Sequence, residues 1–262
     1  MDKAPDSAEL EEEARSLVFR QFDEGMALVL GLAAARMFAA EGGTVHLTGR
    51  DRATIDAAVA SIPGATGYQS DIADPAATEA VVAAIEARDG RIDVLYINAG
   101  VGGFAPLRQI TEEAWDHTHA INLRGCVFAL QKALRIMGRG GSVVVTGSIG
   151  AHGALEGNGT YAAAKAGLYM AMKVFAKELV GEGIRVNVVS PGPIETPLLY
   201  RNPGMTEDQV AGLREMMVAN IPMHRMGEAD DVAKAVLFLA SDDASFITAA
   251  NLFVDGGLIE LG

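Results

Sequence analysis

Four polar side chains in the middle of the chain have the types and spacing needed to move a proton at a carbonyl or alcohol oxygen. Tyr161 and Lys165 are four residues apart, so a helix would place them on one face. An ammonium one turn away stabilises a phenolate, which makes a tyrosine usable as a general acid–base group near neutral pH. Ser148 follows the predicted strand Ser142–Thr146, and its hydroxyl could hydrogen-bond a substrate oxygen there. Asn122 interrupts an apolar helical stretch, and its amide could bond a backbone carbonyl or hold a water.

Each of these residues also fits an ordinary structural role when it is taken alone. Tyr161 could pack on the stem of Lys165 at the surface. Ser148 could simply close a glycine-rich turn, and Asn122 could be a polar residue on a helix face. The functional interpretation therefore depends on a fold that brings the four side chains together.

The elements around them alternate short β-branched runs with Ala-rich stretches of helical length. Nearly continuous apolar runs are typical of parallel strands that are buried on both faces. Strict alternation predicts right-handed βαβ units, and hence an α/β, Rossmann-like, doubly wound parallel sheet of about seven strands in a single domain. We expect strands at Met26–Leu30, Thr44–Thr48, Thr66–Ser70, Ile92–Asn98, Ser142–Thr146, Ile184–Ser190 and Asn251–Val254, and helices at Ala33–Glu41, Arg52–Ser61, Pro75–Asp89, Glu112–Met137, Thr160–Gly181 and Asp230–Ala240.

Composition excludes several classes of function. The 262 residues are 50% hydrophobic, which is enough for a packed core and excludes global disorder. A net charge of −13 disfavours a nucleic-acid partner, because the phosphate backbone would be repelled. The single cysteine, Cys126, excludes a disulfide framework and a cysteine zinc site, and it is compatible with a cytoplasmic location. The five histidines have no spacing that indicates a metal site.

Charge and hydropathy also suggest how the chain is organised. The acidic start, residues 1–20, is expected to be a solvated extension with a helix at Ala8–Leu17, and residues 21–262 the folded domain. The apolar run Gly25–Ala35 is too short to span a bilayer, so we expect no membrane partner and no secretory signal. Residues 198–226 form a candidate lid, and their mixture of Leu, Tyr and Met fits a mostly apolar substrate.

Several motifs in this order and at these spacings resemble the short-chain dehydrogenase/reductase family, from about Met26 to Gly257. The resemblance rests on Asp71-Ile72, Ile97-Asn98-Ala99-Gly100, Asn122, Ser148, Tyr161 with Lys165, Ser190-Pro191-Gly192, and a tail from Arg225-Met226-Gly227 to Asp255-Gly256-Gly257.

The resemblance implies roles for the four polar residues and for the strand ends. Tyr161 would donate or accept the proton, Lys165 would stabilise its phenolate and bond the nicotinamide ribose, and Ser148 would orient the substrate oxygen. Asn122 would anchor a relay water. A homotetramer or homodimer built on the helices that carry Asn122 and Tyr161 is implied as well. The cofactor cleft would be lined by Gly31, Arg50, Asp71, Ile72, Asn98, Ala99, Gly100, Tyr161, Lys165, Pro191, Gly192, Ile194 and Thr196.

The end of the second strand indicates which dinucleotide is preferred. An acidic side chain there would pair with the ribose hydroxyls of NAD(H), but this chain has Gly49 followed by Arg50. Arginine suits a 2′-phosphate by its charge and its fork of donors, so the pair favours NADP(H) over NAD(H). The alternative is that Arg50 is only a solvated residue at the start of a helix.

The sequence departs from the family at the glycine-rich turn that normally binds the diphosphate. Our favoured alignment takes Met26–Leu30 as the first strand and Gly31 as the last glycine of the turn, so that about six turn residues are missing. Loss of two charge-assisted hydrogen bonds would cost ~4 kcal/mol, on the order of a thousandfold in affinity. A second alignment takes Leu17 to Phe19 as the strand and starts the helix near Met26.

Two functions follow from these observations. The leading prediction is an NADP(H)-dependent oxidoreductase that interconverts ketones and secondary alcohols, with Tyr161 as general acid–base. The alternative is a protein of the same fold that binds no dinucleotide and acts as a redox-neutral enzyme or as a binding or oligomer partner. The substrate would be a mostly apolar small molecule in the first case.

Overall fold

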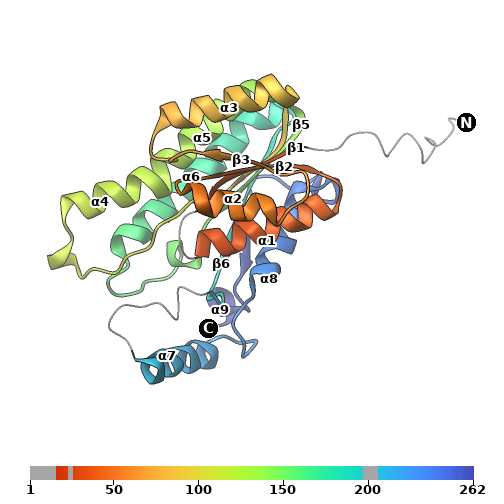
Figure 1. The fold of residues 1–262 in the computed structure, drawn as a ribbon. Coiled ribbons are helices and arrows are strands. Elements are labelled where there is room, and N and C mark those ends of the chain that lie inside the picture. The colour runs from red at the N-terminus through yellow and green to blue at the C-terminus, as the bar shows by residue number, and fades with distance from the viewer. Residues whose placement is uncertain (1–15, 23–25, 197–205) are drawn as a thin grey trace, which may run out of the picture.

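Parallel strands build a single sheet through the centre of the molecule (Figure 1). The computed structural model describes residues 16–22, 26–196 and 206–262, and it gives the backbone alone for 16–22, 26–27 and 207. Within these residues the strand order is β3-β2-β1-β4-β5-β6-β7. From β1 the chain first adds β2 and β3 on one side, and then crosses over to add β4 to β7 on the other side, so the strand order switches between β1 and β4. Ligands bind at such switch points in open α/β sheets. The strands are β1 (Ser16–Phe22), β2 (Thr44–Gly49), β3 (Thr66–Gln69), β4 (Ile92–Ile97), β5 (Met137–Thr146), β6 (Arg185–Pro191) and β7 (Asn251–Val254).

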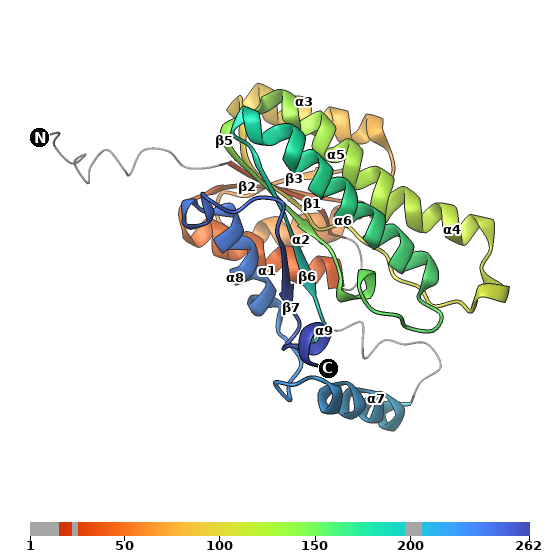
Figure 2. The same cartoon turned by 180° about the vertical axis from the view of Figure 1, so that it is seen from behind.

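Helices cover both faces of the sheet (Figures 1 and 2). One face packs against α3, α5 and α6, and the other packs against α1 and α8. The predicted doubly wound parallel sheet is therefore confirmed. The described helices are α1 (Met26–Ala40), α2 (Arg52–Ala60), α3 (Pro75–Asp89), α4 (Glu112–His119), α5 (Cys126–Ala133), α6 (Gly159–Leu179), α7 (Glu207–Asn220), α8 (Ala229–Ala240) and α9 (Leu258–Leu261).

Local capping explains why several predicted helix ends are right. The Asp74 side chain accepts a hydrogen bond from Ala76 N, Pro75 takes the first helical position, and Gly90 ends α3 with a φ of 73°. The Thr111 side chain accepts from Ala114 N at the start of α4. Helical structure follows the prediction from Glu112 as far as Ile136, but a π-helical segment, Ala120–Gly125, divides it into α4 and α5. The predicted last residue, Met137, is wrong, because it begins β5 and pairs with Ile92 of β4.

The first strand corrects our favoured alignment. Met26–Leu30 is not a strand: it forms the first turns of α1, and Ser16–Phe22 is the strand between β2 and β4. The physical reason is the content of Met, Ala and Leu, which are strong helix formers, so the run continues into the helix that follows it. Residues 16–20 therefore belong to the sheet rather than to an extension. The expected helix at Ala8–Leu17 is wrong at Ser16 and Leu17, which begin β1, and residues 8–15 lie outside the described ranges.

Two further expectations concern the ends of the domain. The candidate lid, 198–226, includes α7, while residues 198–205 lie outside the described ranges. Arg214 Nε on α7 donates to Glu195 Oε2 at 2.9 Å, which joins this helix to the turn after β6. None of the helices described is long and apolar enough to cross a membrane.

Candidate active site

Helix α6 brings Tyr161 and Lys165 to the carboxyl ends of β4 and β5. The Lys165 side chain is 2% exposed, and its Nζ donates to the carbonyl oxygen of Thr146 at 2.8 Å. The same Nζ lies 6.0 Å from the centre of the Tyr161 ring. A buried ammonium needs such an acceptor, so the end of β5 fixes where the charge sits relative to the phenol ring.

Asn122 fastens the loop that follows β4. It is fully buried in the π-helical segment, and its Nδ2 donates to Val101 O while its Oδ1 accepts from Val101 N, both at 2.8 Å. A side chain on Gly100 would begin 3.4 Å from Lys165 Nζ and 3.6 Å from Asn122 Oδ1. The missing side chain of Gly100 therefore leaves room beside both functional groups. A π-helical turn inside an α-helix is often found at a functional site.

Ser148 and Tyr161 converge on Gly150. Ser148 Oγ accepts from Gly150 N at 3.0 Å and caps the short turn that follows β5. A Cβ atom on Gly150 would lie 3.3 Å from Ser148 Oγ, 3.5 Å from Tyr161 Cε1 and 2.9 Å from Asn158 Nδ2. Because the Ser148 oxygen accepts from the backbone, its own proton can be donated to a ligand. The fold thus brings together the serine and the tyrosine that the sequence places thirteen residues apart.

The end of β4 is held from within the sheet. The Tyr96 hydroxyl donates to Asn98 Oδ1 at 3.0 Å, and Thr146 Oγ1 lies 2.8 Å from both of these oxygens. Complete burial raises the pKa of Tyr96, so the phenol stays neutral and can donate. Asn98 is therefore used in fixing the strand end.

The turn after β6 is packed closely against the tail of the chain. Gly192 N donates to Val254 O at 3.0 Å, and a Cβ atom on Gly192 would lie 2.6 Å from Asp255 Cβ. Pro191, Ile194 and Thr196 are buried at the same strand end. Only glycine permits this approach. The close packing of the Gly192 backbone against Asp255 therefore determines the position of the residues that are expected to line the cleft here.

The remaining predicted cofactor residues are spread over the adenine side of the sheet. Arg50 is exposed directly after β2, and its carbonyl accepts from Gln69 Nε2 at 2.8 Å. Asp71 Oδ1 accepts from Ala73 N at 2.8 Å, and Ile72 is buried. Gly31 is not at a strand end: it is a buried residue in the second turn of α1. Its expected position at the diphosphate turn is therefore wrong, because the strand that precedes α1 ends at Phe22.

The residues present fit one half of a dinucleotide. Lys165 Nζ beside Gly100 could donate to a ribose hydroxyl, and Gly100 at the end of β4 would admit a flat ring. The turn between β1 and α1, residues 23–25, lies outside the described ranges. In the residues that are described, no group of three His, Cys, Asp or Glu side chains could hold a metal ion.

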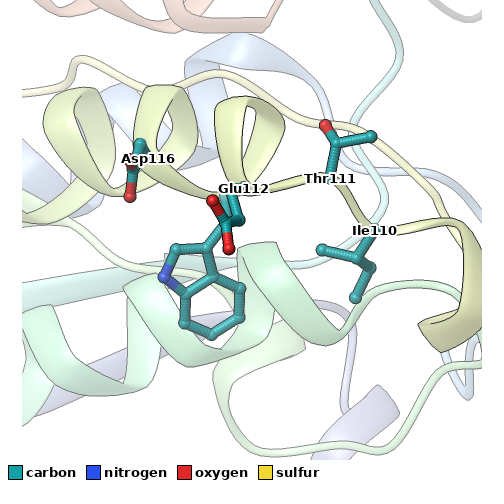
Figure 3. A pocket seen from close by; sticks show the side chains of 5 residues that line it. Ile110, Thr111, Glu112 and Asp116 are labelled. Carbon is teal, nitrogen blue, oxygen red and sulfur yellow. The ribbon is translucent and has the colours of Figure 1, made fainter.

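Sequence reasoning missed two residues of this site. Thr146 supplies the carbonyl that holds Lys165, and Asn158 places its amide 2.9 Å from the position that a Cβ atom on Gly150 would take. The only signal for Asn158 was its position three residues before Tyr161, between two glycines. A separate pocket of about 310 Å³ lies at the start of α4 and contains none of the catalytic candidates (Figure 3). Its lining comprises Ile110, Thr111, Glu112, Trp115 and Asp116.

Several known proteins are similar to this chain in sequence. A family profile described as enoyl-(acyl carrier protein) reductase matches residues 25–259. The 3-oxoacyl-(acyl-carrier-protein) reductase FabG of Thermotoga maritima is 38% identical over 90% of this chain and 95% of its own length. The D-threitol dehydrogenase of Mycolicibacterium smegmatis is 35% identical over 89% of this chain and 90% of its own.

Solved structures give the same result. Levodione reductase superposes with a TM-score of 0.84 at 33% identity, covering 92% of this chain and 96% of its own. A short-chain dehydrogenase/reductase of Brucella melitensis superposes with a TM-score of 0.83 at 29% identity, covering 94% of this chain and 97% of its own. The parallel sheet with its switch point, the Ser148–Tyr161–Lys165 arrangement and these similarities have one explanation: the chain belongs to the short-chain dehydrogenase/reductase family.

Proposed function

We propose that this oxidoreductase transfers a hydride between NADP(H) and a ketone or secondary alcohol, with Tyr161 as the general acid–base. The observation that carries the proposal is the approach of Ser148 Oγ and Tyr161 Cε1 to within 3.5 Å of one position beside Gly150, with Lys165 held near the tyrosine ring by the carbonyl of Thr146. Relatives named as reductases and dehydrogenases support the same class of reaction.

Each side chain has a distinct task in this proposal. The Ser148 hydroxyl donates to the reacting oxygen, because its own oxygen already accepts from Gly150 N. Tyr161 gives its phenolic proton to that oxygen on reduction, and the Lys165 ammonium stabilises the phenolate that remains. Asn122 keeps the loop after β4 in place through Val101. The bound nicotinamide would supply or accept the hydride.

The preference for NADP(H) rests on the end of β2. Gly49 presents no carboxylate to the adenine ribose, and Arg50 is exposed beside it, where a guanidinium suits a 2′-phosphate. Asp71, Ile72, Asn98, Ala99, Gly100, Pro191, Gly192, Ile194 and Thr196 would line the rest of the cleft. We leave Gly31 out, since it lies within α1.

A substrate with apolar parts fits the surroundings of the site. Phe104, 70% exposed, lies against Gly157, and Ala105 N donates to Gly157 O at 2.9 Å, so this apolar loop borders the segment that leads to Tyr161. The names of two relatives, a 3-oxoacyl reductase and levodione reductase, are consistent with carbonyl substrates.

A second candidate is a protein of this fold that binds no dinucleotide and performs proton transfer alone or only binds a partner. The observation that favours it is the sequence between β1 and α1, Asp23-Glu24-Gly25, which has one glycine and two carboxylates where a diphosphate would bind. Carboxylates oppose a diphosphate electrostatically.

Titration of the purified protein with NADPH and, separately, NADH distinguishes the two candidates. We expect quenching or enhancement of nicotinamide fluorescence with a micromolar Kd for NADPH and a weaker Kd for NADH, followed by oxidation of NADPH when a ketone is added. Absence of binding of either nucleotide up to millimolar concentration would overturn the reductase proposal and favour the second candidate.

We also propose that the protein is a cytoplasmic homotetramer or homodimer. Support comes from exposed apolar side chains on the helices that carry Asn122 and Tyr161, namely Trp115, Phe128, Met170 and Val174. Exposed apolar groups on one set of helices are typical of a surface that another protein copy covers. Light scattering during size-exclusion chromatography tests the mass, and a monomer at micromolar concentration would contradict this proposal.

A further inference from the structure

The turn that carries Ser148 ends at His152, a residue that the proposed mechanism does not use. This turn, residues 147–152, follows β5 and closes on itself: His152 N donates to Ile149 O at 2.9 Å, and Gly150 N donates to Ser148 Oγ at 3.0 Å. These bonds are local, so they fix the shape of the turn but not its place relative to the sheet. Contacts with other elements must fix its place.

Ser190 on β6 fixes the first end of the turn, at Gly147. Gly147 N donates to Val189 O at 2.7 Å, and a Cβ atom on Gly147 would lie only 2.6 Å from Ser190 Oγ. Ser190 is 1% exposed, and its hydroxyl donates to Asn251 Oδ1 of β7 at 2.7 Å. The first end of the turn therefore packs on a serine whose hydrogen bond leads to the next strand.

The same Asn251 side chain holds the last residue of the turn, His152. Asn251 Nδ2 lies 2.9 Å from His152 Nε2. Because an amide nitrogen only donates, the imidazole nitrogen must accept, and the bond requires a neutral ring with its proton on Nδ1. Both halves of the amide are then used, since its oxygen accepts from Ser190 and its nitrogen donates to His152.

A ring on the same strand holds the imidazole in the direction that this bond needs. Asn251 and Phe253 are two residues apart on β7, so their side chains lie on one face of the sheet. The rings of His152 and Phe253 meet edge-on, with centroids 5.0 Å apart and planes at 90°. His152 is exposed to solvent, so its orientation depends on such contacts rather than on burial.

We propose that His152 is a positioning residue, which holds the turn so that the Ser148 hydroxyl keeps its place beside Tyr161. Asn251 makes this possible, because one amide bonds the serine that packs on the first end of the turn and the histidine at its last end. The inference rests on the proposed function, in which the Ser148 hydroxyl donates to the reacting oxygen. Charge grows on that oxygen in the transition state, so a well-placed donor contributes to kcat more than to KM.

Two substitutions at His152 separate the hydrogen bond from the ring contact. His152→Phe keeps an aromatic ring beside Phe253 but has no acceptor, whereas the amide oxygen of His152→Gln can replace Nε2 as the acceptor. With a confirmed ketone and NADPH, we expect kcat to fall about 5- to 10-fold in His152→Phe, with KM and the Kd for NADPH nearly unchanged. His152→Gln should retain most of kcat. Full kcat in His152→Phe, or equal losses in both variants, would overturn the proposal.

Asn251→Leu tests the same bond from the other side. It should lower kcat at least as much as His152→Phe does, and the double variant should be no slower than Asn251→Leu alone, because both changes remove one bond. Losses that multiply in the double variant would overturn the link between the two residues. The matched control is His117→Phe, an exposed histidine on α4, which should keep its kcat. An equal loss of kcat there would show that the effect does not depend on the turn, and would also overturn the proposal.

Hydrogen exchange keeps this proposal separate from the reductase proposal. Mass spectrometry follows exchange of the backbone amides of residues 147–153 without nucleotide or substrate. We expect faster exchange in His152→Phe and Asn251→Leu than in the wild type, and nearly wild-type exchange in His152→Gln. That pattern in a protein that reduces no ketone would support the placing of the turn by His152 and overturn the reductase proposal alone. Ketone reduction by the wild type, with exchange and kcat both unchanged in His152→Phe, would overturn the role of His152 and leave the reductase proposal standing.

Discussion

The two ends of the cofactor cleft are built from different kinds of residue. At the catalytic end, which comprises β4, β5 and α6, buried polar groups have specific partners: Lys165 bonds Thr146, and Asn122 bonds both peptide groups of Val101. At the β1–α1 end, α1 packs through Leu30, Ala34 and Ala35 into the same apolar cluster as α8. No polar residue of α1 is buried in the described part of this helix.

This contrast shows which parts of a fold a sequence determines most strictly. A buried polar group must find a particular partner, so its position along the chain indicates a particular place in the structure. Apolar contacts are tolerant of exchange, and a short apolar run fits either a strand or a helix. The buried polar pairs therefore determine the geometry of the catalytic end, whereas apolar packing alone determines that of α1.

The largest effect is expected at the catalytic end. Tyr161→Phe removes the acid–base group and should lower kcat for ketone reduction about 10²- to 10⁴-fold while the Kd for NADPH changes little. The measurement is steady-state turnover with a confirmed substrate, together with a nucleotide titration. Tyr169→Phe on the same helix is the matched control and should keep turnover; full activity in Tyr161→Phe would contradict the mechanism.

A proline substitution tests the β1–α1 end. Val18 lies in β1 opposite His46 of β2 and Leu95 of β4, so Val18→Pro interrupts a central strand and should lower the free energy of unfolding by about 3 kcal/mol or more. Val18→Thr keeps the backbone donor and should cost less. Chemical denaturation measures both variants. Wild-type stability in Val18→Pro would place the first strand at Met26–Leu30 after all.

The sequence predicts the bounds of an element correctly wherever capping or turn residues flank its apolar pattern. α3 has the predicted bounds because Asp74-Pro75 and Gly90 define its ends, and β2 and β7 follow from β-branched runs between helices. No capping residue separates Met26 from the helix that follows, so nothing in the sequence stopped the helix from extending to Met26. The favoured strand there was wrong for that reason.

Candidate chemistry could be read from the sequence only where a residue type was unusual in its surroundings. Tyr161, Lys165, Ser148 and Asn122 were found in this way, and the structure brings them to the ends of β4 and β5. Asn158 could not be found, because an asparagine between two glycines is typical of a turn. Its burial against Gly150 is a tertiary property that the local sequence does not contain.

The adenine side provides the next comparison, between two neighbouring arginines. Arg50→Ala should weaken NADPH binding about 10- to 100-fold and leave NADH binding nearly unchanged, because charge-assisted bonds to the 2′-phosphate are lost. Arg52 is paired with Asp56 at 2.6 Å on the exposed face of α2, so Arg52→Ala is a matched control that should change neither affinity. Parallel fluorescence titrations measure both. Equal affinity for NADPH in Arg50→Ala would contradict the role of Arg50.

The smallest expected effect concerns a buried histidine on β2, away from the catalytic end. His46 is fully buried, with Nδ1 3.3 Å from the Tyr68 hydroxyl and Nε2 2.9 Å from Asp89 Oδ2. Burial lowers the pKa of His46 below its ordinary value of 6.5, and this outweighs the opposing attraction of the Asp89 carboxylate; Arg88 lowers the pKa further.

Stability should therefore depend on pH through His46. The unfolded chain binds a proton at His46 more readily than the native state, so the free energy of unfolding is fully retained above pH 6.5 and decreases as the pH falls from 6.5 through the lowered native pKa. His46→Gln cannot take up a proton, so denaturation of this variant between pH 8 and pH 5 should give a flatter pH dependence than the wild type. Identical slopes would mean that the Asp89 carboxylate compensates the burial of His46 completely. The catalytic end should not respond to this change, because His46 lies on β2 and its contacts are with Tyr68 and Asp89 rather than with Tyr161 or Lys165.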